Sequence, residues 1–178
     1  MVLNLSKNKL VNCNGLCTMG ALEDLNLSEN EITNTEDLKN MPNLKTLNLN
    51  TNKLTTIAQL PKLPSLDTLD FGANTIEKSD CLAHLQQYPK LTKVSYAGNP
   101  MDDNLADGPK QEILFRLHPV VKVKSVNDDE VTQDDLDEWK GKRKERLKAE
   151  EEARRAAEEK AARGEVSGEE KEAEEEAE

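Results

Sequence analysis

Three cysteines and two histidines are the side chains of this sequence best suited to metal binding or nucleophilic chemistry. Cys13 and Cys17 lie close together, but a zinc site needs about four Cys or His ligands at paired spacings, and no second pair is near them. His84 and His118 are far apart, and neither has a neighbouring side chain of nucleophile character. The eight glycines are scattered and form no phosphate-binding loop. We therefore predict no catalytic residue, no metal site, no cofactor and no small-molecule substrate, and a protein that is not an enzyme.

The cysteines are better explained by structure than by chemistry. Cys13 falls on a frame of apolar residues spaced three apart and is predicted to lie in the core, whereas Cys17 lies off that frame and Cys81 precedes a core position. An odd number of cysteines without a secretory signal indicates reduced thiols in a cytosolic-type compartment. The frame in question runs Leu10, Cys13, Leu16, Met19, Leu22.

Composition excludes several classes of partner. The 178 residues have a formal net charge of −11, and residues 132–178 supply −7 of it, with 18 acidic and 11 basic side chains. Phosphate contacts come from Lys and Arg, so we expect no binding to nucleic acid. Aromatic residues make up only 3%, which argues against a ring-lined pocket. No run of 18 or more apolar residues predicts a membrane span.

The elements that must position any site are set by five regularly spaced asparagines. The first four are 22 residues apart and the last step is 25. The clearest copy of the surrounding pattern is Leu44-xx-Leu47-x-Leu49-xx-Asn52-x-Leu54-xx-Ile57-xx-Leu60. This is the pattern of a leucine-rich repeat, whose period is roughly 20–29 residues. The predicted asparagine ladder comprises Asn8, Asn30, Asn52, Asn74 and Asn99.

Each repeat predicts one short strand and a return segment. Period-two alternation directs Leu47 and Leu49 inward, and parallel stacking of such strands gives a concave sheet. Asn52 lies at the turn, where its amide can both donate to and accept from backbone groups that leave the sheet. The return segment has apolar residues every third position, which favours 3₁₀ turns over an α-helix. The three extra residues before Asn99 keep this phase. The predicted fold class is α/β, a leucine-rich-repeat solenoid with short parallel concave strands.

The outward side chains of the concave strands are the candidate partner surface. They form three predicted rows of small polar residues, without the Trp, Tyr and Arg that are enriched in binding hot spots. The alternative is that these rows are simply solvated strand faces. The first row is Val2, Asp24, Thr46, Thr68, Lys93; the second is Asn4, Asn26, Asn48, Asp70, Ser95; the third is Ser6, Ser28, Asn50, Gly72, Ala97. From these we select Asp24, Asn26, Thr46, Asn48, Asn50, Thr68, Asp70, Lys93 and Ser95 as the candidate site.

Four regions follow from these patterns. Residues 1–99 are predicted to be repeats, the first of them truncated, so that the sequence starts as a fragment or short isoform or presents an open end to a partner. Residues 100–131 are predicted to form a C-terminal cap. Residues 132–163 are predicted to form a long, charged, solvent-exposed α-helix with a capping box at its start, because no sustained apolar heptad supports a coiled coil. Residues 164–178 are Glu-rich and predicted to be disordered.

The repeat pattern and its end resemble a known class of leucine-rich repeat. The triplet-spaced 22-residue repeat, Asn99-Pro100 and the Glu/Lys/Arg-rich helix are similar to the phosphatase-regulator class, and most of all to the radial-spoke and dynein-light-chain proteins of the cilium. The resemblance covers about residues 1–148, although the Tyr-Arg pair usual in the cap helix is absent. It implies a non-catalytic scaffold or adaptor of the ciliary axoneme, in the cytoplasm, that binds other axonemal proteins.

A second resemblance gives the alternative. The segment 57–63 is similar to the repeat of the acidic nuclear leucine-rich phosphoproteins, which carry an acidic tail. That resemblance implies a nuclear regulator of chaperone or phosphatase type. Tails in that family are nearly pure Asp and Glu, whereas residues 132–163 mix both charges. Of the two, the axonemal interpretation fits the helix better.

Overall fold

Two compact units make up the chain, Met1–Trp139 and Lys140–Glu178. The computed structural model describes residues 1–105, 108–117 and 121–162. The predicted disordered tail at 164–178 lies outside the described residues, as do His118 and Pro119.

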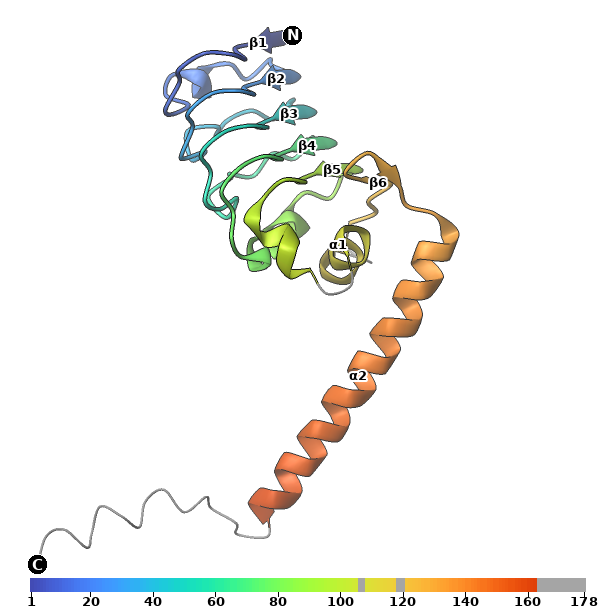
Figure 1. Cartoon of the computed structure of the whole chain (residues 1–178). Helices are drawn as coiled ribbons and strands as arrows, with labels where there is room; N and C mark the ends of the chain where they lie inside the picture. The colour runs from blue at the N-terminus through green and yellow to red at the C-terminus, as the bar shows by residue number, and fades with distance from the viewer. Residues whose placement is uncertain (106–107, 118–120, 163–178) are drawn as a thin grey trace, which may run out of the picture. The chain divides into compact units, whose positions relative to one another are not determined.

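One three-residue strand from each repeat contributes to a parallel sheet in chain order (Figure 1). Each strand pairs with the next in the register that the repeat length requires, so that Leu25 lies opposite Leu47 and Leu47 opposite Leu69. The predicted parallel sheet is confirmed. The strands are β1 (Val2–Asn4), β2 (Asp24–Asn26), β3 (Thr46–Asn48), β4 (Thr68–Asp70) and β5 (Lys93–Ser95).

The apolar frame of each repeat forms the core. Leu47 and Leu49 are completely buried, and burial of each such leucine contributes about 1.5–3 kcal/mol. Return segments turn by i→i+3 hydrogen bonds, as predicted, for example from the N–H of Leu60 to the carbonyl of Ile57 at 3.0 Å. Two return segments contain 3₁₀ helices, η1 (Leu16–Thr18) and η2 (Ser79–Gln87). The three-residue insertion lies in the longer of them and keeps the frame in phase, since Leu82, Leu85 and Tyr88 are all buried.

The ladder asparagines join successive repeats by hydrogen bonds. The Asn52 Nδ2 donates to the carbonyls of Leu27, Leu49 and Asn50 at 3.0, 3.1 and 3.3 Å. Its Oδ1 accepts the N–H of Ile32 at 3.0 Å. One side chain therefore satisfies backbone groups of its own turn and of the preceding repeat. Bonds of the same kind are made by Asn30, Asn74 and Asn99.

The first ladder position differs from the rest. The Asn8 Nδ2 donates to the carbonyls of Leu5 and Ser6, at 2.9 and 3.1 Å, within its own repeat. Asn8 is exposed, whereas Asn30, Asn52, Asn74 and Asn99 are buried. The ladder function predicted for Asn8 is therefore limited to its own turn.

The residue before each ladder asparagine adopts left-handed backbone geometry. This conformation costs a residue with a side chain roughly 1–2 kcal/mol, and it brings the asparagine amide back onto its own turn. Glycine, which adopts it freely, occupies only one of the five positions. The φ angles are 60° at Lys7, 55° at Glu29, 55° at Thr51, 47° at Ala73 and 81° at Gly98.

Residues 100–131 fold onto the last repeat. A 3₁₀ helix, η3 (Pro100–Asn104), follows Asn99, and an α-helix, α1 (Pro109–Leu117), comes next. Strand β6 (Ser125–Val126) then pairs in parallel with β5, and β7 (Asp129–Glu130) returns antiparallel to β6. The sheet therefore ends in one antiparallel pair, β6 and β7, next to the parallel concave strands.

A two-residue turn between β6 and β7 produces this antiparallel pair. Asn127 and Asp128 have φ angles of 49° and 66°, the combination required by a type I′ hairpin turn. The Asn127 Oδ1 also accepts the N–H of Tyr96 at 2.7 Å and of Ala97 at 3.1 Å. The hairpin thereby satisfies backbone donors at the end of β5.

The described residues end in the C-terminal helix α2 (Gln133–Ala162), in the region where the sequence predicts a helix. The N–H of Thr132 donates to the Asp135 carboxylate at 2.8 Å, and the N–H of Asp135 donates to the Thr132 hydroxyl at 3.2 Å, which forms the predicted capping box. These bonds from Thr132 hold the pKa of Asp135 below its ordinary value. Trp139 is buried, at 5% exposure. Within the described residues, no helix has both the length and the apolar character needed to cross a membrane.

Candidate interaction surfaces

The strand register brings the predicted concave rows together. Asp24, Thr46, Thr68 and Lys93 stand on successive strands at equivalent positions. Asn26, Asn48, Asp70 and Ser95 do the same one pleat further on. Because consecutive strands in a sheet lie about 4.8 Å apart, each row is a closely spaced line of small polar side chains. Whether a partner binds these rows stays a prediction.

The second row also has a structural role that sequence reasoning missed. The Asn48 Oδ1 accepts the N–H of Asn50 at 2.9 Å, and the Asp70 Oδ1 accepts the N–H of Gly72 at 2.9 Å. Asn4 and Asn26 make the same bond two residues on. These are Asx turns, which Asn and Asp favour because their side-chain oxygen reaches the second following N–H. The signal for them was the Asn or Asp that ends each of the first four strands.

The third row lies in these turns, two residues beyond the second row. Gly72 belongs to it, and a Cβ atom there would lie 2.8 Å from the Asn50 Nδ2 and 2.9 Å from the Ala97 carbonyl oxygen. Glycine is therefore needed for close approach of the neighbouring turns. The Asn50 Nδ2 donates to the Asp70 carboxylate at 3.3 Å, so two predicted site residues are in direct contact.

A small polar hollow lies at the hairpin end of the concave face. Its volume is about 170 Å³, which is below the roughly 300 Å³ at which small-molecule pockets begin and suits a single partner side chain. Five of its residues belong to the predicted rows, namely Asn50, Asp70, Gly72, Ser95 and Ala97. Sequence analysis missed Asn127 and Asp128, which the hairpin brings to the hollow. The hollow is lined by Asn50, Asp70, Gly72, Ser95, Ala97, Asn127 and Asp128.

Ion pairs connect neighbouring repeats beside the rows. The Lys45 Nζ lies 2.5 Å from the Glu23 carboxylate, and the Lys53 Nζ lies 2.7 Å from the Glu31 carboxylate. The bond from Lys45 lowers the pKa of Glu23, and the same bond raises the pKa of Lys45. All four side chains are well exposed, so solvent and salt screen these pairs and they add little to stability.

The chemically suited side chains are not brought together. Burial raises the pKa of the Cys13 thiol to about 12, and burial also raises the pKa of Cys81. The His84 Nε2 lies 2.9 Å from the carbonyl oxygen of Leu60, which gives the ring a structural contact between repeats. Across residues 1–105, 108–117 and 121–162, no three His, Cys, Asp or Glu side chains are grouped so as to hold a metal ion.

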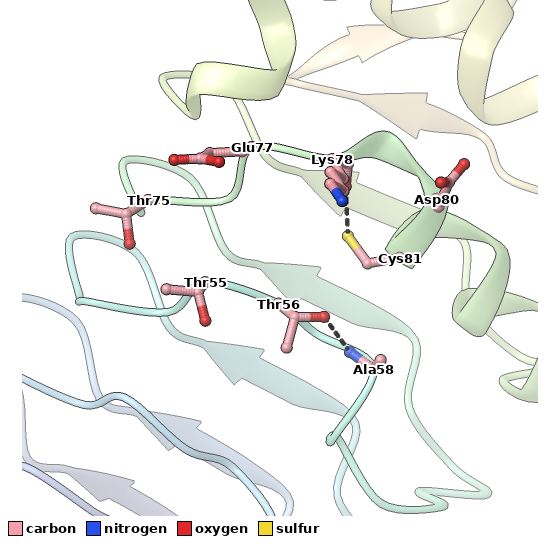
Figure 2. Close-up of a pocket in the computed structure, with 8 residues that line it drawn as sticks. All are labelled: Thr55, Thr56, Ala58, Thr75, Glu77, Lys78, Asp80 and Cys81. Atoms are coloured by element: carbon pink, nitrogen blue, oxygen red, sulfur yellow. Dashed lines mark hydrogen bonds between the residues drawn. The ribbon is translucent and has the colours of Figure 1, made fainter.

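A larger hollow lies between the return segments of the third and fourth repeats, and we call it the return-segment hollow (Figure 2). Its volume is about 530 Å³. Figure 2 shows Thr55, Thr56 and Ala58 on one segment and the charged residues on the next. The fourth repeat contributes Thr75, Glu77, Lys78, Asp80 and Cys81. Sequence analysis did not anticipate this site.

The second unit, from Lys140 onward, is helical as far as Ala162. Leu147, which is apolar, is 55% exposed. Ion pairs spaced i,i+4 join Lys148 to Glu152 at 3.9 Å and Glu151 to Arg155 at 3.3 Å. Each such pair stabilises a helix by about 0.2–0.5 kcal/mol.

Comparisons with known proteins identify the repeats. A family described as leucine-rich repeats in two copies matches residues 20–62 and again 42–84. The chain is therefore a protein that contains leucine-rich repeats, as the pattern of leucine and asparagine predicts. No curated protein matches the sequence.

A solved internalin from Listeria monocytogenes is similar in structure. The TM-score is 0.47 at 20% sequence identity, over 70% of this chain and 46% of the internalin. The present chain thus spans less than half the length of that protein.

Proposed function

We propose that this protein is a non-catalytic protein-binding module, and that the concave rows contact the partner. Leucine-rich-repeat domains generally mediate protein–protein interaction, and the repeats are present here. The observation that carries the proposal is the register, which aligns Asn26, Asn48 and Asp70, and the residues beside them, on successive paired strands. Such a surface is already ordered, so a partner binds it without a large loss of conformational entropy.

The chemistry of the rows favours a polar, directional contact. Thr46, Thr68 and Ser95 offer hydroxyl groups, while Asp24 and Lys93 add one charge of each sign near opposite ends of the first row. The side chains are short, so a helix or a large side chain of a partner can approach the strands closely. The 170 Å³ hollow gives that surface one concave point for an anchoring side chain.

Substitution in the middle of the rows tests this proposal. Thr46→Arg places a long side chain on the central strand β3, where it blocks close approach, and Gln59→Arg is the matched control on the exposed return segment of the same repeat. We expect proteins captured by the full tagged chain to be lost with Thr46→Arg and kept with Gln59→Arg, with unchanged circular dichroism for both. Equal capture by the two variants would contradict a concave binding surface.

For the cellular role, we propose a scaffold or adaptor of the ciliary axoneme, and we infer that residues 100–131 are the C-terminal cap of the phosphatase-regulator class of repeat. Support comes from the resemblance of the 22-residue repeat, Asn99-Pro100 and the charged helix. The proposed location is the cytoplasm and the axoneme, with solvent exposure of the helix beyond Trp139. Expression of the tagged chain in ciliated cells tests this. A nuclear signal with none in cilia would instead favour the nuclear phosphoprotein-like regulator suggested by residues 57–63.

A further inference from the structure

We propose that the return-segment hollow binds an extended peptide segment of a protein partner, in which an aliphatic residue and a basic residue lie two positions apart. This site is separate from the concave rows. It rests on the proposed function only in that its ligand is a protein. The proposal follows from how the hollow uses its polar atoms, from its size, and from the charges around it.

The floor of the hollow is apolar although it is built from Thr and Cys. The Thr56 hydroxyl accepts the N–H of Ala58 at 3.1 Å, and the Thr75 hydroxyl donates to the carbonyl of Leu54 at 3.0 Å. The Cys81 thiol donates to the carbonyl of Lys78 at 3.3 Å (Figure 2). Since these polar groups already have partners inside the protein, the parts of these side chains left for a ligand are mainly apolar. An aliphatic side chain suits that floor.

The size and exposure of the hollow favour a peptide. A volume of about 530 Å³ is within the roughly 300–1,000 Å³ of ligand sites and exceeds the size of one side chain. Thr55, Ala58 and Thr75 are exposed, so the hollow is open along the surface instead of closed around a small molecule. No aromatic ring lines it. An extended segment that lays two alternate side chains, which project from the same face of the peptide, into the hollow matches this shape.

The charges around the hollow favour a basic residue in that segment. Glu77 and Asp80 supply two carboxylates against the one ammonium of Lys78, all exposed. Arg116 lies 3.4 Å from one oxygen of Asp80, but the Asp80 side chain remains 87% exposed and available to a ligand. The net charge of −11 attracts basic segments and repels acidic ones over longer range. Charge complementarity therefore selects the aliphatic–basic pair.

The hollow arises because the return segments of the third and fourth repeats differ in size. Small residues occupy the third repeat at Thr56 and Ala58, while η2 in the fourth repeat carries the three-residue insertion. In the second repeat the position equivalent to Ala58 is Glu36, whose N–H donates to the Asn34 side-chain oxygen at 2.7 Å, as the N–H of Ala58 donates to Thr56. Glu36 is exposed as well and lies outside the hollow, which makes it the natural control position.

Peptide titration of the full ¹⁵N-labelled chain tests the proposal. The probe is acetyl-Ala-Leu-Ala-Arg-Ala-amide, and its binding is followed by the amide chemical shifts of the protein. We expect saturable shifts centred on Thr56, Ala58 and Cys81. Replacing Leu by Ala or Arg by Glu in the peptide is expected to weaken binding by about threefold or more. Absence of saturable shifts, shifts centred elsewhere, or equal binding of all three peptides would overturn the proposal.

Two variants complete the test. Ala58→Trp fills the hollow and is expected to abolish the shifts, whereas Glu36→Trp, which adds the same side chain one repeat earlier, is expected to keep them. Equal binding by both variants would overturn the site. Thr46→Arg on the concave face is expected to leave peptide binding unchanged. Failure of the concave proposal therefore does not affect this result, and failure here does not affect the concave proposal.

Discussion

Thr35 is the buried residue whose substitution tests the packing most sharply. It is 1% exposed and occupies the same repeat position as Cys13 and Ile57, which are core residues. Its hydroxyl oxygen has no hydrogen-bond partner within the part of the chain that the structure describes. We expect Thr35→Val, which replaces the hydroxyl with a methyl group of nearly the same size, to stabilise the protein.

The expected gain follows from two contributions. A buried hydroxyl without a partner costs about 1–3 kcal/mol in protein mutational data, and this cost disappears in the variant. The added methyl group buries further apolar area, although the fit in a packed core is imperfect and offsets part of the gain. We therefore expect the free energy of unfolding to rise by about 1–2 kcal/mol at Thr35→Val.

Urea titration followed by circular dichroism measures this change. The midpoint should rise with an unchanged slope, since the slope reports the surface exposed on unfolding. Thr55→Val, at an exposed position, is the matched control and should change stability by less than about 0.5 kcal/mol. Thr35→Ser, which keeps the hydroxyl and removes the methyl, should destabilise. A loss of stability in Thr35→Val would refute the reasoning, because it would show that the hydroxyl makes a favourable interaction.

Three further predictions concern the ladder, the close turn and the buried thiol. Asn52→Asp places a carboxylate against three carbonyl oxygens. In the same titration it should lower the free energy of unfolding by about 3–5 kcal/mol. A loss below about 1 kcal/mol would contradict the structural role of the asparagine ladder. Gly72→Ala should lower it by about 1–3 kcal/mol, because the new Cβ would lie 2.9 Å from the Ala97 carbonyl, and an unchanged melting temperature would show that the turn adapts. Burial raises the pKa of Cys13 to about 12, so its thiolate is scarce at pH 8, and iodoacetamide should label it about 1,000-fold more slowly than in the urea-unfolded chain. Peptide mapping by mass spectrometry measures this labelling rate, and similar rates in the folded and unfolded chain would contradict burial of Cys13.

Periodicity made the repeats predictable. Leu47 is buried and Asn52 bonded to the preceding repeat because every repeat meets the same environment, so one pattern specifies all of them. The 3₁₀ return turns and the in-phase insertion follow from the same spacing of three. The start of α2 was predictable for a different reason, since Thr132 and Asp135 form a local capping box that needs no distant partner.

Features outside the period were not predictable in this way. The turn at Asn127 depends on left-handed geometry at two residues, Asn127 and Asp128, which no repeated spacing indicates. The return-segment hollow depends on a difference in size between two neighbouring segments. Neither segment has a pattern of its own that shows it.

The position of the candidate concave site was predictable, but the prediction of its role was incomplete. Alternation placed Asn48 and Asp70 on the outer face, and the register agrees. One side-chain oxygen of each accepts the backbone N–H of the residue two positions further along the chain. An outward-facing residue can thus serve the fold and a partner at once, which spacing alone does not reveal.

The direction of the ladder bonds has a consequence for how the chain folds during synthesis. Asn52 reaches back to the carbonyl of Leu27 and the N–H of Ile32, which precedes it by 20 residues. A repeat leaving the ribosome therefore has unpaired backbone groups at its turn until the next asparagine has been made. At about 5–20 residues per second, each repeat waits roughly one to four seconds for the residue that completes it. Asn127 ends this series of hydrogen bonds between repeats, because it lies in the hairpin turn and requires no further repeat after it.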